Sequence, residues 1–77
     1  MSRVSGKSDD TRLLERIGTR VRARRHELEL SQEALADAAG IDRSHMGKIE
    51  RGERNVTILN LAKIAAALDC DLANLVG

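Results

Sequence analysis

The chain has 77 residues, enough for one small domain that buries about 60% of the surface of its unfolded chain. Apolar residues make up 42% of the sequence, and phenylalanine, tyrosine, tryptophan and proline are absent, which favours an aliphatic helical core over β-structure. The single cysteine excludes an internal disulfide, and a net charge of +1 excludes a uniformly basic surface.

The first predicted element is a helix that begins at Asp10 or Thr11. Residues 1–9 are small, polar and aperiodic, so we interpret them as a flexible arm and residues 10–77 as the folded domain. Gly18 lies inside the helix and weakens it by about 1 kcal/mol relative to alanine. Apolar residues with helical spacing mark its inner face: Leu13, Leu14, Ile17, Val21 and Leu28.

Two short helices are predicted next, separated by a turn at Gly40. Ser31 can cap the first of them, and glycine can end it because the left-handed conformation has no steric cost for this residue. Asp42 can cap the second, which runs to about Arg51 before Gly52 closes it. The residues expected to face the core are Ala34, Leu35, Ala38 and Ala39 in the first helix and Met46 and Ile49 in the second.

Two further helices follow, capped by Thr57 and Asp71. The expected inward residues of the fourth helix are Ile58, Leu61, Ile64, Ala65 and Leu68, and the last helix carries Leu72, Leu75 and Val76. Five helices without a strand predict an all-α domain.

The segment from Gln32 to Arg51 has the arrangement of a helix-turn-helix unit, with two helices of about eight residues around a tight turn. Ala36 is small enough to let the second helix cross closely. The outward stripe of that second helix is Arg43, Ser44, Gly47 and Lys48. In such a unit the second helix enters the major groove of DNA, where arginine can bind guanine in a bidentate manner. Gly47 either clears space for the groove wall or is an indifferent exposed glycine.

The stretch SQEALADAAGIDRSHMGKIERGERNVT resembles the Xre-type helix-turn-helix family of phage repressors and Cro proteins, and within it the controller proteins of restriction–modification systems. The resemblance covers residues 12–76 through three markers: SQE-LA--AG, IERGERN and NLAKIAAAL. It implies a compact five-helix, lambda-repressor-like fold and a transcription regulator that binds double-stranded DNA.

The resemblance also implies roles for individual residues. The base-reading positions are Arg43, Ser44, Lys48 and Arg54. Backbone-contacting or supporting positions are Gln32, His45, Arg51, Asn55, Thr57 and Asn60. Arg25 and Glu50 match a buried or half-buried ion pair that joins the first helix to the third. His45 departs from the family pattern, since controller relatives often carry tyrosine there, and a partly packed spacer is an equal alternative.

A homodimer on a palindromic operator is the expected form, because one recognition helix reads too few base pairs for useful specificity. The candidate dimer interface is Leu59, Leu72, Leu75 and Val76, with RNA polymerase as a candidate further partner. The competing interpretation is an antitoxin-type or other protein-interaction module. An antitoxin would normally carry an additional tail, and the chain ends at Gly77, which favours the regulator.

Other functions receive no support from the sequence. No catalytic spacing is visible, so we expect no enzyme activity and no cofactor. A metal site would require His26, His45 and Cys70, which have no ligand spacing. No apolar run approaches the roughly 20 residues of a membrane span, and no signal-peptide core is present. We therefore expect a soluble protein of the cytoplasm without a membrane partner.

Overall fold

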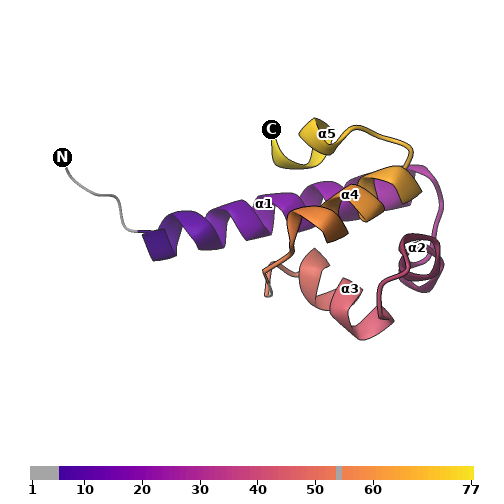
Figure 1. Cartoon of the computed structure of the whole chain (residues 1–77), viewed down its shortest axis with the longest axis horizontal. Helices are drawn as coiled ribbons and strands as arrows, with labels where there is room; N and C mark the ends of the chain where they lie inside the picture. Colours follow the sequence, from indigo (N-terminus) through magenta and orange to yellow (C-terminus); the bar gives the residue numbers. More distant parts are fainter. Residues whose placement is uncertain (1–5, 54) are drawn as a thin grey trace.

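The computed structural model describes residues 6–53 and 55–77, with side chains from Arg12 onward. These residues form five α-helices and no strand, which confirms the predicted all-α class (Figure 1). The helices are α1 (Gly6–Glu27), α2 (Gln32–Ala39), α3 (Arg43–Glu50), α4 (Ile58–Ala67) and α5 (Leu72–Val76).

Helix α1 begins at Gly6, four residues before the earlier of the two predicted starts. The polar stretch that we assigned to an arm contains no proline, so nothing in it prevents the helix from extending toward the N-terminus. The rest of the proposed arm, residues 1–5, lies outside the described residues. Figure 1 shows the N-terminal part of α1 projecting beyond the other helices.

One aliphatic core joins all five helices. Helix α1 packs against α3 and α5, α2 packs against α3 and α4, and α4 also contacts α5. The fully buried side chains of the core include Val21, Leu35, Met46, Ile49, Ile64, Leu68 and Leu75. The helix-turn-helix unit thus rests on a platform formed by α1 and α4.

Four residues assigned to the core are exposed: Leu13, Leu28, Ala38 and Ile58. Leu13 is 39% exposed in the N-terminal half of α1, and Leu28 is 37% exposed because it follows the end of this helix. Ile58 is 68% exposed at the first position of α4. In α2, Leu35 and Ala39 are buried as predicted, Ala34 is half-buried, and Ala36 lies on the inner face in place of the exposed Ala38.

Two arginines of α1, Arg20 and Arg24, hold the C-terminal helices in place. Arg24 donates from Nε to the Leu68 carbonyl oxygen at 3.0 Å and from Nη2 to the Asp69 carbonyl oxygen at 3.3 Å. Arg20 donates to the carbonyl oxygen of Gly77. These bonds satisfy carbonyl groups at the ends of α4 and α5, which would otherwise lack partners inside the helices.

Gly18 sets the distance between α1 and α3. A Cβ atom at this position would lie 2.5 Å from the Glu50 carbonyl oxygen and 2.6 Å from that of Ile49. Backbone atoms at these distances cannot be avoided by a change of rotamer. Gly18 lowers the stability of α1 as an isolated helix, but it is also the residue at which α3 crosses α1.

We predict that Gly18→Ala destabilises the protein, even though alanine is the better helix former. Moving two helices apart should cost about 1–3 kcal/mol or more, typical of an overpacked core, and should exceed the roughly 1 kcal/mol that alanine contributes. Chemical denaturation measures the difference. The matched control is Ala38→Gly, at an exposed position of α2, which should lose about 1 kcal/mol through helix propensity alone. An unchanged or raised stability of Gly18→Ala would contradict this packing.

Candidate nucleic-acid interface

The two helices of the helix-turn-helix unit begin at well-formed caps. Ser31 Oγ accepts a hydrogen bond from the Ala34 amide at 2.9 Å, at the start of α2. Asp42 Oδ2 accepts from the Ser44 and His45 amides at 3.0 and 3.3 Å, at the start of α3. Between the helices, Gly40 adopts a left-handed conformation with φ of 69°. The caps and turn that we predicted therefore fix where α3 begins.

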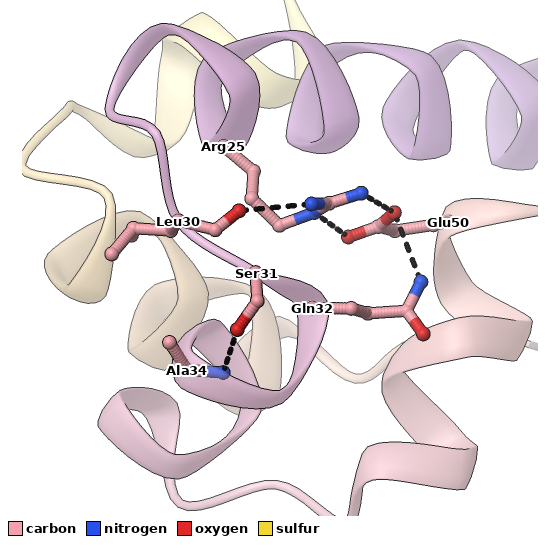
Figure 2. Close-up of polar contacts among 6 residues, drawn as sticks. All are labelled: Arg25, Leu30, Ser31, Gln32, Ala34 and Glu50. Carbon is pink, nitrogen blue, oxygen red and sulfur yellow. Dashed lines mark hydrogen bonds and ion pairs between the residues drawn. The ribbon is translucent and has the colours of Figure 1, made fainter.

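A buried ion pair anchors α3 from behind. Arg25 Nε donates to Glu50 Oε2 at 2.8 Å, and Arg25 Nη2 donates to Glu50 Oε1 at 3.0 Å (Figure 2). The two residues are only 9% and 7% exposed. The third donor, Nη1, binds the Leu30 carbonyl oxygen at 2.9 Å. The ion pair that the resemblance implied is thus present, bidentate and buried.

Gln32 extends this pair into a network that joins three elements. Its Nε2 donates to Glu50 Oε1 at 3.1 Å, so one carboxylate accepts hydrogen bonds from α1 and from the first residue of α2 (Figure 2). Because Glu50 is the last residue of α3, the network fixes the C-terminal end of this helix against the other two. We call the set of Arg25, Gln32 and Glu50 the support network.

The opposite face of α3 carries exposed polar groups. Arg43 and Ser44 are exposed and Lys48 is half-buried, whereas Met46 and Ile49 on the other side are buried. A shallow depression lies beside these groups, between the start of α2 and the outer face of α3; it is lined by Gln32, Asp42, Arg43, Ser44, Gly47 and Arg51. Three of the predicted base-reading residues therefore share one helix and one apolar backing.

Gly47 does not lie open on this face, as the sequence interpretation had it. The residue is buried, and a Cβ atom added to it would lie 3.3 Å from both Gln32 Oε1 and Arg51 Nη1. The space freed by this glycine is taken by side chains of the protein itself. Spacing on a helical face cannot reveal this, because the covering residues come from α2 and from the end of α3.

The loop after α3 carries a separate exposed ion pair. Arg51 Nε donates to Glu53 Oε2 at 3.0 Å, and Arg51 Nη2 donates to Glu53 Oε1 at 3.2 Å. The hydrogen bond to Glu53 and its negative charge raise the pKa of Arg51, and the same hydrogen bond lowers the pKa of Glu53. The guanidinium of Arg51 therefore stays charged, lies on the surface and is paired with the Glu53 carboxylate in the free protein.

The remaining candidate contacts lie near the start of α4. Thr57 Oγ1 accepts from the Asn60 amide at 3.0 Å, so this hydroxyl is used as the helix cap. Asn55 is exposed and Asn60 is half-buried. Arg54, the fourth predicted base-reading residue, lies outside the described residues.

His45 is partly packed. The residue is half-buried, and its Nε2 atom is buried without a hydrogen-bond partner among the described residues. Of the two alternatives left open for this position, the packed spacer fits this placement better than a contact to DNA.

The predicted dimer residues differ in their exposure to solvent. Leu59 is 63% exposed next to the 68% exposed Ile58, and Leu72 and Val76 are half-buried. Leu75 is 1% exposed in the core of its own protomer, so its assignment to the interface is wrong. Ile58 is exposed although helical periodicity placed it on the buried stripe of α4.

The described residues contain no cluster of three histidine, cysteine or acidic side chains able to hold a metal ion. Cys70 is half-buried, and burial raises the pKa of its thiol. Nor is any helix in the described part of the chain long and apolar enough to span a bilayer.

We predict a large stability difference between the two ion pairs. Glu50→Gln leaves the Arg25 guanidinium buried without its counter-charge, which should cost about 3–5 kcal/mol. Glu53→Gln removes a pair at the surface and should change the unfolding midpoint little. Urea denaturation of both variants beside the wild type tests this. A Glu50→Gln midpoint equal to that of wild type would show that the pair is not desolvated.

Comparison with known proteins identifies the arrangement. The helix-turn-helix family profile matches residues 21–75. Control protein C.MunI of Mycoplasma sp is 39% identical over 61 residues, which cover 78% of this chain and 82% of that protein. Control protein C.SmaI of Serratia marcescens is 41% identical over 59 residues, which cover 77% and 70%. The crystal structure of the restriction-modification controller protein C.AhdI from Aeromonas hydrophila superposes with a TM-score of 0.79 at 47% identity, covering 80% of this chain and 94% of that one.

Proposed function

The chain belongs to the helix-turn-helix family, and on that basis we propose that it is a sequence-specific DNA-binding transcription regulator of the controller type. The observation that carries the proposal is the construction of α3, which is anchored from behind by the support network and carries Arg43, Ser44 and Lys48 on its other side. Such a regulator is not an enzyme, since its action consists of binding.

In the proposed complex, α3 enters the major groove with its N-terminal residues nearest the bases. Arg43 is the first residue of this helix and is exposed, so its guanidinium can make a bidentate contact to guanine O6 and N7. Ser44 can donate or accept a hydrogen bond, and Lys48 lies one turn further along, within reach of a base edge or a phosphate. These three residues supply the sequence preference, with Arg54 as a fourth candidate.

Phosphate contacts would come from the edges of the unit. Arg51 is the most direct candidate, because a phosphate can replace Glu53 as the partner of its guanidinium. Gln32, at the start of α2, and Asn55, in the loop before α4, are candidates for weaker contacts, and Thr57 and Asn60 for supporting roles. Such contacts set the position of α3 in the groove without reading the sequence.

We further propose a homodimer that binds a palindromic operator in bacterial cytoplasm. Ile58 and Leu59 form an exposed apolar pair at the start of α4, which a two-fold axis could bury against the same residues of a second copy. A bound dimer would act on transcription at a promoter, where RNA polymerase is the candidate further partner. The same apolar pair could instead bind an unrelated protein, as in an antitoxin-type module.

Arg43 and Arg51 should differ in what they contribute to binding. Arg43→Ala should cost about 1–3 kcal/mol on the best duplex selected from a random pool and relax the preference at one position per half-site. Arg51→Ala should weaken binding to selected and scrambled duplexes equally and reduce the salt dependence by about one counterion per half-site. Fluorescence titrations at several salt concentrations measure both effects.

Two outcomes would count against this division of roles. Equal losses of Arg43→Ala on both duplexes would show that Arg43 grips DNA without reading it. A wild-type protein that binds selected and scrambled duplexes alike would refute the regulator function and favour the interaction module.

The dimer proposal predicts a concentration-dependent two-subunit species. Sedimentation at micromolar protein concentration should show it, and Leu59→Asp should shift the equilibrium to monomer, because a buried carboxylate in an apolar interface is strongly disfavoured. Leu28→Asp is the matched control, since Leu28 is also an exposed leucine but lies outside the proposed interface. A wild type that stays monomeric at high concentration would assign the apolar pair to another partner.

A further inference from the structure

Gly47 occupies an unusual position for a glycine. It lies in the middle of the eight-residue helix α3, where glycine lowers helix stability by about 1 kcal/mol relative to alanine, and its φ is not in the left-handed region that glycine serves elsewhere in this chain. A Cβ atom added to Gly18 would clash with backbone atoms of α3. A Cβ atom added to Gly47 would instead lie 3.3 Å from the ends of two flexible side chains, those of Gln32 and Arg51. An alanine would fit here if Gln32 and Arg51 moved slightly.

The first of these side chains has a fixed orientation. The carboxylate of Glu50 can only accept hydrogen bonds, so the amide nitrogen of Gln32 must face it and Oε1 must face away. Figure 2 shows this arrangement, with Nε2 directed at Glu50 and Oε1 on the opposite side. The oxygen lies 3.3 Å from the position of a Cβ on Gly47. An alanine would press on the amide that the support network holds.

The second side chain reaches Gly47 from the end of α3. Arg51 Nη1 lies at the same 3.3 Å from the added Cβ, while its Nε and Nη2 bind Glu53. The two side chains thus converge over one glycine, at the depression that Arg43 and Ser44 also line. The Arg51 guanidinium supplies donors suited to a phosphate at this depression. Gln32 presents Oε1 toward Gly47, and its second N–H, which Glu50 does not use, is the group of this side chain that can donate to the same phosphate.

We propose that Gly47 is a positioning residue for DNA binding: its lack of a side chain allows Gln32 and Arg51 to close over α3 and bind one phosphate group beside the base-reading residues. The inference rests on the proposed function, since the ligand is DNA. It explains why a helix used for recognition retains a residue that lowers its own stability. The glycine acts through its two neighbours and need not touch DNA itself.

The experiment separates stability from binding. Gly47→Ala should raise the melting temperature by up to about 6 °C, the effect of roughly 1 kcal/mol of helix propensity on a domain of this size. It should also weaken binding to the duplex selected by the wild type about tenfold, the effect of one perturbed contact. A scrambled duplex should lose affinity by the same factor, because a phosphate contact carries no sequence information.

Coupling to the neighbours provides the control. If Gly47 acts through them, Gly47→Ala should weaken binding far less in a background that already carries Gln32→Ala together with Arg51→Ala. In the free protein, the side-chain amide resonances of Gln32 should shift in Gly47→Ala and remain in place in Ala38→Gly. This spectroscopic readout depends on the orientation of the amide and needs no DNA.

Three results would overturn the inference while leaving the regulator function intact. The first is wild-type affinity in Gly47→Ala, and the second is a tenfold loss that persists undiminished when Gln32→Ala and Arg51→Ala are also present. The third is a loss of affinity accompanied by a lower melting temperature, which would assign Gly47 to folding alone. Unmoved Gln32 resonances would overturn it as well. If the wild type itself failed to bind any duplex, the proposed function would fail first, and the phosphate-binding role with it.

Discussion

The buried carboxylate of Glu50 is the group on which the arrangement of this domain depends. Removing a carboxylate and a guanidinium from water is costly, so the pair is tolerated only when its geometry is good and its other hydrogen-bonding groups find partners. Here Arg25 supplies two bonds to the carboxylate and a third to the Leu30 carbonyl oxygen, and Gln32 supplies one more. An apolar contact would permit α3 to slide or rotate. A directional, bidentate contact allows one orientation, so the pair determines the position of α3 more than it determines the total stability.

Steric limits complete what this polar contact begins. Gly18 lets the backbone of α3 approach α1 closely at residues 49 and 50, so the carboxylate of Glu50 falls within reach of Arg25, two helical turns further along α1. The core that surrounds this contact is aliphatic and contains no aromatic side chain. The direction of the hydrogen bonds to Glu50 and the missing Cβ atom of Gly18 thus act together to place α3 against α1.

Local chemistry in the sequence was sufficient to predict much of this structure. The helices and their caps follow from Ser31, Asp42 and Thr57, whose side chains act over three residues or fewer, and the ion pair followed from a family resemblance. The errors concern contacts between distant segments. Periodicity placed Ile58 in the core and left Leu75 for a partner, because a helical wheel cannot tell which apolar residue a neighbouring helix covers. The burial of Gly47 was missed for the same reason.

Among the described residues, the support network uses none of the three that are proposed to read bases. Arg43, Ser44 and Lys48 form no hydrogen bond through their side chains to Arg25, Gln32 or Glu50 in the described part of the chain, and the caps of α3 involve only the backbone of Ser44 and His45. Base reading and architecture therefore use different side chains of this helix, although Gln32 belongs to the support network and is also a candidate phosphate contact. New operator preferences could arise by exchange of the outward side chains alone. Evolution or protein engineering could obtain from one unchanged scaffold many regulators that do not bind one another's sites.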